Sequence, residues 1–507
     1  MKIAKIRHLQ WSLLTFSSLL VFGFISRVNA AGTTYYVSSS GGNDSNSGTA
    51  ATQAWRSLAK VNSIAFQPGD QILFKSGDTF TGGLAPQGSG ASGQPVVVDT
   101  YGSGPKPHLD GAGKVNAVVK LQNQQYWTVQ NLELTNDAGT DTSERWGVDI
   151  VGNNAGTLHG IHVNNLTIHD VRGWADWNTM PFDTASAIGV NIYGGGQDKI
   201  TKFDDVLIKN NTIYNIYGGG ITLYSAYNVS PNSANPDANR WSSHVVIKNN
   251  WLNYTNGLVL NGADGPVIDR NVVYNSHKSP YAINVTCNVG LFFTYVRNAL
   301  VQHNEVAHSG NSCDSEGFDN DIGTQGTNIW QYNYSHDNPG GFFMVTEGSD
   351  NAQIIIRFNL SQNDGIGSQV KLGSGHVSFY NNTIYNSSDR TIVSGQPGGG
   401  GYFYATATLT NNIFMGKPGI YDLFEPQFTY DSNIFYQDAG VASDSHKSSL
   451  DPLFVNPGSG GDGIGTVSGY KLQSDSPALN TGAIIPNNGG KDYFGNSLPA
   501  NTADRGF

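Results

Sequence analysis

The chain has 507 residues, of which 13% are charged, with 63 glycines and a formal net charge of −11. This negative charge argues against a nucleic-acid partner, because binding to a phosphate backbone depends on lysine and arginine. It would also repel an acidic polysaccharide, unless a local basic patch offset it. Runs that favour helix formation are few.

The first 30 residues are predicted to be a secretory signal peptide. Lys2, Lys5 and Arg7 precede an apolar stretch over residues 11–25, and residues 28–30 offer small side chains for cleavage. The stretch is shorter than the ~20 residues that a membrane span needs, so a transmembrane anchor is the weaker alternative. We expect a secreted or periplasmic protein, with no membrane contact after cleavage.

Residues 31–507 are predicted to form one domain. Residues 31–110 should supply a first strand near Tyr35, a polar loop, a short amphipathic helix around residues 55–60 and the first turns of a repeat. The helix would cap the exposed apolar end of the stack. Residues 445–507 should close the domain. Both ends resemble secreted parallel β-helix enzymes that act on polysaccharides.

An asparagine followed by a short apolar or aromatic run recurs along the chain. The spacing has a floor near ~21 residues with irregular insertions above it, as expected when each turn of a coil needs a minimum perimeter. Parallel connections favour a right-handed coil. The sequence therefore predicts an all-β, right-handed parallel β-helix. The repeated residues are Asn131, Asn165, Asn211, Asn250, Asn271, Asn304, Asn333, Asn359, Asn382, Asn412 and Asn433.

A second strand recurs between these asparagines, beginning for example at Val148, Val190, Ile221 and Leu258. Side chains alternate between the two faces of a strand, so the first and third positions should point inward. The others should line one continuous exterior groove, where tyrosines could stack on sugar rings and polar groups could bind hydroxyls. These outward residues are Asp149, Asn191, Tyr193, Tyr224, Asn284, Asp319 and Asp321.

One copy of this strand breaks the pattern. In Phe318-Asp319-Asn320-Asp321 the third, inward position is an asparagine, and burying an amide without partners costs roughly 1–3 kcal/mol. The densest acidic cluster of the chain surrounds it, including Asp314, Glu316 and Glu347. Carboxylates in unequal environments are what acid–base chemistry uses.

These carboxylates predict a glycoside hydrolase, in which one carboxyl protonates the leaving oxygen and another activates water or attacks the anomeric carbon. We expect Asp319, Asp321 and Glu347 to be catalytic, with Asp321 as the acid. His336 and Lys371 are predicted to contact substrate. His336 could instead satisfy a turn, and Lys371 could be a solvated lysine. No cofactor is expected, although clustered aspartates in such folds can bind Ca²⁺.

The segment from Glu316 to Phe342, with Glu316-Gly-Phe-Asp-Asn-Asp321 and Trp330-Gln-Tyr-Asn-Tyr-Ser-His-Asp-Asn338, resembles secreted right-handed parallel β-helix glycosidases. It is most similar to glycoside hydrolase family 141, which includes fucosidases and xylanases. The resemblance implies that acidic residues of this segment carry the catalytic role.

Two alternatives stay open. A polysaccharide lyase or C5-epimerase would use Lys371 as its base, with Ca²⁺ bound by Asp314, Asp319 and Asp321, but an acidic cleft suits a uronic-acid polymer poorly. A non-catalytic carbohydrate-binding surface protein would not need the acidic cluster. A polysaccharide or oligosaccharide is the expected partner of what we predict to be a monomer.

Cys287 and Cys313 are the only cysteines of the chain. An exported protein can form a disulfide, and their separation is close to one turn of the coil. We predict that they lie within disulfide range, with two buried free thiols as the alternative.

Overall fold

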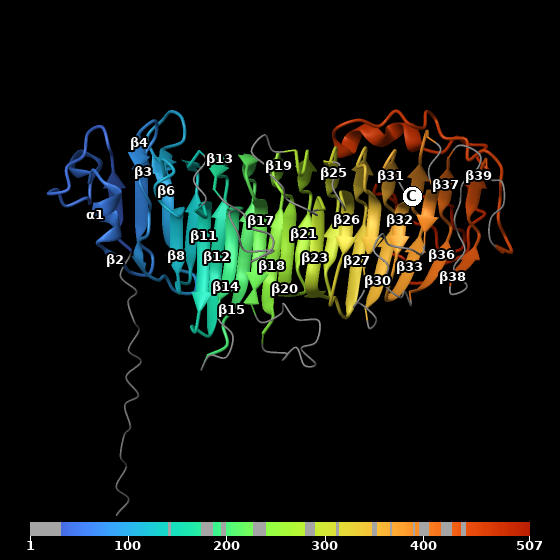
Figure 1. The fold of residues 1–507 in the computed structure, drawn as a ribbon, viewed down its shortest axis with the longest axis horizontal. Helices are drawn as coiled ribbons and strands as arrows, with labels where there is room; N and C mark the ends of the chain where they lie inside the picture. The colour runs from blue at the N-terminus through green and yellow to red at the C-terminus, as the bar shows by residue number, and fades with distance from the viewer. Residues whose placement is uncertain are drawn as a thin grey trace, which may run out of the picture. The chain divides into compact units, whose positions relative to one another are not determined.

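The computed structural model describes residues 32–139, 143–173, 186–193, 199–226, 240–278, 289–310, 314–346, 352–365, 368–388, 391–394, 405–416, 428–437 and 443–507. The chain from Gly32 onward forms one compact unit. It coils through three parallel sheets and is the expected right-handed parallel β-helix (Figure 1). The proposed signal peptide lies outside the described residues, so it stays a prediction.

Strands of successive turns pair in parallel and form the three sheets. The first sheet contains β1 (Thr34–Val37), β3 (Gln71–Lys75), β6 (Val96–Tyr101), β9 (Trp127–Gln130), β12 (Thr157–Asn164), β15 (Lys202–Lys209), β18 (Ser242–Lys248), β21 (Val267–Asp269), β24 (Leu300–Gln302), β27 (Thr327–Gln331), β30 (Gln353–Arg357), β33 (His376–Tyr380), β36 (Thr406–Thr410) and β38 (Phe428–Asp431). The second sheet contains β8 (Ala117–Gln122), β11 (Trp146–Asn153), β14 (Ser186–Tyr193), β17 (Gly219–Ser225), β20 (Leu258–Asp264), β23 (Leu291–Arg297), β26 (Glu316–Asn320), β29 (Gly341–Val345), β32 (Ser368–Leu372) and β35 (Thr391–Ser394). The third sheet contains β4 (Thr79–Thr81), β7 (His108–Asp110), β10 (Glu133–Asp137), β13 (Thr167–Arg172), β16 (Thr212–Ile216), β19 (Trp251–Asn253), β22 (Val272–Tyr274), β25 (Glu305–Ala307), β28 (Tyr334–His336), β31 (Leu360–Gln362), β34 (Thr383–Tyr385), β37 (Ile413–Met415) and β39 (Ile434–Tyr436).

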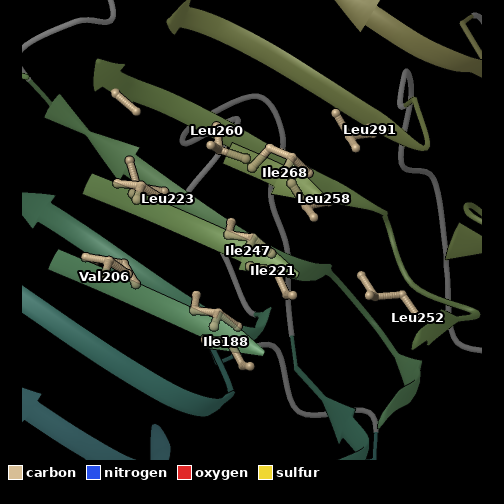
Figure 2. Packing of buried hydrophobic residues seen from close by; sticks show 14 of the residues in the cluster. Ile188, Val206, Ile221, Leu223, Ile247, Leu252, Leu258, Leu260, Ile268 and Leu291 are labelled. Atoms are coloured by element: carbon tan, nitrogen blue, oxygen red, sulfur yellow. The ribbon is translucent and has the colours of Figure 1, made fainter. Parts of the chain in front are cut away.

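The interior of the coil is filled by stacked aliphatic side chains (Figure 2). In the second sheet, Ile188, Ile221, Leu258 and Leu291 occupy equivalent positions of successive strands and are all fully buried. Burying one such side chain stabilises the fold by roughly 1.5–3 kcal/mol. The repeated aliphatic positions of the sequence therefore form the core, as expected.

The repeated asparagines form a buried ladder between the first and third sheets. From Asn211 to Asn433, each side-chain amide donates a hydrogen bond to the Oδ1 atom of the next asparagine, at 2.8–3.1 Å. Each Nδ2 also donates to a backbone carbonyl, as Asn333 does to Val301 at 3.0 Å. The ladder ends on Asp444. It fixes the corner of every turn that it spans.

Two members of the predicted repeat occupy a different position. Asn131 and Asn165 have left-handed backbones, with φ of 61° and 50°, as does Asn210, which precedes the ladder residue Asn211. The backbone N–H of Leu166 donates to Asn211 Oδ1 at 2.9 Å. Leu166 therefore takes the ladder position in its turn, and Asn165 lies one residue before it.

The two ends of the coil are covered differently. Near the start, α1 (Leu58–Asn62) buries Leu58 and Val61 against the core, and η1 (Ala51–Gln53) and the short pair β2 (Ala65–Phe66) and β5 (Gln87–Gly88) lie close by in the sequence. Residues 443–507, with η3 (Ile464–Tyr470), pack outside the third sheet, where Phe454 and Tyr470 join a second apolar cluster. No helix among the described residues is long and apolar enough to cross a membrane.

Candidate functional site

The outer face of the second sheet carries one continuous column of aligned residues. Strand register places them at equivalent positions of nine successive strands, and their neighbours on either side, such as Phe343 and Val345, lie in the core. The column contains, in order, Lys120, Asp149, Gly189, Thr222, Val259, Phe292, Asp319, Met344 and Lys371. Its polar ends are separated by an apolar centre.

Four carboxylates gather on this face at β26. The charges of Asp321, Glu316 and Asp314 all act on Asp319, so Asp319 lies among the other three. Asp319 is 2% exposed and Glu316 is fully buried, whereas Asp314 and Asp321 are only partly buried. Asp314 and Asp321 are therefore the carboxyls of the cluster that a ligand can reach most readily.

One lysine and one threonine from the following strands hold two of these carboxylates. Lys371 Nζ donates to Glu316 Oε1 across two strand spacings, past Met344. The hydroxyl of Thr346, which follows β29, donates to Asp321 Oδ1. The cluster thus has one cation against four acidic groups among the described residues.

Burial and mutual repulsion shift the protonation of the cluster. Burial raises the pKa of Asp319 well above its usual range, and the charges of Asp321, Glu316 and Asp314 raise it further, while Lys371 opposes them. Burial raises the pKa of Glu316 to about 7, again against the effect of Lys371. Burial also raises the pKa of Asp314. Carboxyls that stay protonated near neutral pH can donate protons.

Two oxygens of the cluster lack hydrogen bonds. Asp319 Oδ1 and Glu316 Oε2 are buried and receive none from the described residues. Buried polar atoms in folded proteins are almost always partnered, so orphaned ones need an explanation such as catalysis or an absent ligand. The inward Asn320 donates from Nδ2 to Thr324 Oγ1 at 2.6 Å, but its Oδ1 atom also receives no hydrogen bond from the described residues.

The residues predicted to line the same face partly meet that expectation. Asn191 Nδ2 donates to Asp149 Oδ1 at 3.0 Å, and Lys120 pairs with Asp149 at 3.4 Å. The rings of Tyr193 and Tyr224 lie 6.4 Å apart, so both tyrosines are on one face of the sheet as predicted. Burial raises the pKa of Asp149, which Lys120 and Asn191 oppose.

His336 does not belong to this face. It lies on β28 of the third sheet, fully buried, with Nδ1 at 2.9 Å from Asp337 Oδ2 and Nε2 at 3.2 Å from Glu305 Oε1. The prediction that His336 contacts substrate beside Asp319 was wrong, because one turn passes through all three sheets and neighbours in sequence land on different faces. His336 is a structural residue under the C-terminal segment.

The register of the following strands decides which side chains reach the cluster. Phe318 pairs with Phe343, which turns Met344 outward. Lys371, on the strand after that, donates to Glu316. Sequence reasoning counted Asp314 and Glu316 in the acidic cluster but gave neither a catalytic role. The partial exposure of Asp314 and the ion pair of Glu316 single them out, and neither has a local sequence signal.

Several predicted residues lie outside the described part of the chain. They are Asn284, Glu347, Cys287 and Cys313. The groove above the sheet and the disulfide therefore stay predictions, as does the role of Glu347.

Two groups of residues could in principle offer ligands to a metal ion. Oxygen ligands such as Asp314, Glu316, Asp319 and Asp321 suit Ca²⁺ chemically, but Lys371 already occupies Glu316. A second possible ligand group, His308, His336 and Asp337, lies on the third sheet with its ligand atoms within 4.8 Å of one another. Both nitrogens of His336 face carboxylates, which suits an imidazolium better than a metal ligand.

Comparisons with known proteins agree with the parallel β-helix fold. No known protein-family profile matches the chain. A lacto-N-biosidase of Bifidobacterium longum subsp. longum is 28% identical to it, over 76% of this chain. The chain spans only 29% of the length of that relative.

Solved structures share the fold. A family 136 glycoside hydrolase, the lacto-N-biosidase of Eubacterium ramulus, superposes with a TM-score of 0.65 at 24% identity, over 74% of this chain and 67% of that one. XylC in complex with xylose gives a TM-score of 0.50 at 12% identity, over 94% and 98% of the two chains. These likenesses establish the architecture. They do not show family 141, to which the sequence bears a resemblance; the solved glycosidase belongs to family 136.

Proposed function

We propose that the chain is a secreted glycoside hydrolase of the family 136 type, acting on lacto-N-biosides or closely related oligosaccharides. The observation that carries this proposal is the cluster of four carboxylates around Asp319 on the outer face of β26. Support for the substrate comes from the names of the two lacto-N-biosidases that the chain is similar to.

The two reachable carboxyls divide the chemistry between them. Asp314 is partly buried and its raised pKa keeps it protonated for longer as pH rises, so it is the better general acid. It protonates the leaving oxygen while the bond from that oxygen to the anomeric carbon breaks. Asp321, held by Thr346, stabilises the developing positive charge and either attacks the anomeric carbon or takes a proton from the attacking water.

This assignment revises the roles expected from the sequence. Asp321 was expected to be the acid and Asp319 its partner, but Asp319 is almost fully enclosed, whereas Asp314 and Asp321 are partly exposed and easier for a sugar to reach. We assign Asp319 to the second layer, where as a neutral carboxyl it limits the repulsion between Asp314, Glu316 and Asp321. Lys371 balances one charge of the same group by pairing with Glu316.

The lyase alternative is less well supported by these contacts. A lyase would use Lys371 as the base that removes a proton from the sugar, but Lys371 Nζ already donates a hydrogen bond to Glu316 Oε1. A uronic-acid polymer would also meet four acidic groups and one described cation. A non-catalytic binding protein would have no use for the raised pKa values of Asp319, Glu316 and Asp314, which suit proton transfer.

The experiment is incubation with an aryl lacto-N-bioside and with a panel of plant and microbial glycans. We expect release of the aryl group and of a disaccharide, with new reducing ends and no absorbance of an unsaturated uronate. Unsaturated products that disappear in Lys371→Ala would replace the hydrolase by the lyase. Binding without any product from the panel would favour the non-catalytic protein.

A further inference from the structure

A cavity lies between the third sheet and the C-terminal segment, on a different side of the coil from the carboxylate cluster. Its volume is about 400 Å³, within the range of roughly 300–1,000 Å³ that small-molecule sites occupy. The coil contributes Arg270, His303, Glu305 and Tyr332 to its lining, and the C-terminal segment contributes Lys471 and Phe494, among others.

Glu305 is the buried charged group of this cavity, and it is 1% exposed. Its Oε1 atom accepts hydrogen bonds from the Tyr274 hydroxyl at 2.6 Å and the Gly463 backbone N–H at 2.7 Å, and it lies 3.2 Å from His336 Nε2. Its Oε2 atom is buried and receives no hydrogen bond from the described residues. In Glu305, Oε1 is therefore held by hydrogen bonds, whereas Oε2 can still accept one from a ligand.

Tyr493 supplies the complementary open group. It lines the same cavity, and its hydroxyl is buried without a partner among the described residues. Burial raises the pKa of Tyr493 above its usual range, and the charge of Glu305 raises it further. The hydroxyl therefore stays protonated at physiological pH and can donate a hydrogen bond.

The charges around the cavity select against ionic ligands. The Glu305 carboxylate repels an anion, while Arg270 and Lys471 repel a cation. The ligand that suits the cavity is therefore a neutral molecule that has many hydroxyl groups and one apolar face, which can pack on an aromatic ring. Phe494 offers such a ring, and Lys471 Nζ lies 5.0 Å from its centre.

We propose that this cavity is a second, non-catalytic saccharide site that binds a neutral pyranose. A sugar hydroxyl donates to Glu305 Oε2, a ring or hydroxyl oxygen accepts from Tyr493, and the apolar face of the sugar packs near Phe494. Such a site would hold an oligosaccharide chain on a side of the protein away from the hydrolytic residues, and it does not depend on the proposed hydrolase activity.

The test measures binding of neutral methyl glycosides of galactose, glucose, N-acetylglucosamine, xylose and fucose to the full chain, by calorimetry and saturation-transfer NMR. Ser468→Trp fills the cavity from an exposed lining position without disturbing the coil. Ser474→Trp, exposed and outside the lining, is its matched control. Tyr493→Phe removes only the open hydroxyl, and thermal melting checks that each variant is folded.

We expect at least one glycoside to bind the wild type saturably. Ser468→Trp should raise the dissociation constant at least about tenfold, which corresponds to ~1.4 kcal/mol of binding free energy. Tyr493→Phe should raise it about threefold or more. Ser474→Trp and the cluster variant Asp321→Asn should bind as the wild type does. The proposal is overturned if no glycoside binds, if binding survives Ser468→Trp, or if Asp321→Asn abolishes it.

Discussion

Two buried aspartates of the coil, Asp364 and Asp319, show how differently the same side chain is treated in two regions. Asp364 stands at a corner after the third sheet, where its Oδ1 accepts from the Asn338 backbone and amide at 2.9 and 3.0 Å and its Oδ2 accepts from Ser361 at 2.7 Å. Asp319 stands on the outer face of the second sheet with Oδ1 unpartnered among the described residues.

Burial raises the pKa of both aspartates, but its consequences differ between the two regions. At Asp364, hydrogen bonds from Ser361, Asn338 and Ser335 oppose the effect of burial. At Asp319, three neighbouring carboxylates add to it. Asp364 serves the fold, and its oxygens accept several hydrogen bonds. Asp319 has an oxygen without a hydrogen bond and three carboxylates close by, which indicates a site for a ligand or a reaction.

The largest expected effect is the loss of activity when the proposed general acid, Asp314, is replaced. Asp314→Asn removes the general acid, so kcat should fall at least ~100-fold on oligosaccharides, whose leaving group must be protonated. An aryl glycoside with an acidic phenol needs less help and should lose clearly less. Steady-state kinetics on both substrates give the answer, and equal losses on the two would show that Asp314 is not the acid.

The sequence predicted the coil better than its site, for reasons visible in particular residues. The period-two pattern put Val148, Ile150, Val190 and Ile192 inside, and all four are in the core. The register between strands is another matter, because Val148 pairs with Ile188 rather than Val190. A shift of two residues preserves every inward position, so alternation alone cannot detect it.

The contacts of the cluster at β26 also depend on the register between strands, so they could not be predicted from alternation along the sequence. Glu316 pairs with Lys371 of the outward column, although Glu316 and the inward Phe318 are two residues apart and should face the same way in a regular strand. The distant ion pair, and the burial of Asp319 beneath its neighbours, arise only when three turns are stacked.

The second-largest effect is on stability and concerns the ladder. Asn333→Ala would leave the Asn304 backbone N–H and the Val301 carbonyl unpaired and open a small cavity. We expect a loss of about 2–4 kcal/mol in unfolding free energy, measured by denaturant titration. Asn253→Ala removes an asparagine that is only partly buried and accepts one hydrogen bond from Asn275. It should cost under about 1 kcal/mol, and a similar loss in both variants would contradict the ladder's role.

A smaller effect is expected on the pH dependence of activity. Lys371 lowers the pKa of the proposed acid Asp314 and that of Glu316, which is about 7, so Lys371→Met should leave both carboxyls protonated to higher pH. The alkaline part of the pH–rate profile should then move upward by about one unit. Lys120→Met is the matched control, since Lys120 pairs with Asp149 at the other end of the column, and its profile should not move. An unchanged profile for Lys371→Met would remove Glu316 from the active cluster.

The smallest effect is on the pH dependence of folding. The folded-state pKa of Asp364, about 7, is above its usual value, so the contribution of its protonated form to stability is complete at low pH and is lost as pH rises through about 7. Asp364→Asn keeps the shape without the charge. It should flatten the stability profile between about pH 4 and 7 by at least about 1–2 kcal/mol, measured by melting at several pH values. An unaltered slope would mean that Asp364 does not titrate there.

The most direct test of the account sets Asp321→Asn against Asp364→Asn on the glycoside that the wild type cleaves fastest. Both changes replace one carboxylate oxygen by an amide nitrogen, one on the outer face of the second sheet and one at a corner of the coil. The account predicts that Asp321→Asn lowers kcat at least ~100-fold with little change in melting temperature, while Asp364→Asn keeps kcat within about threefold of the wild type. Full activity in Asp321→Asn, or equal losses in the two variants, would contradict it.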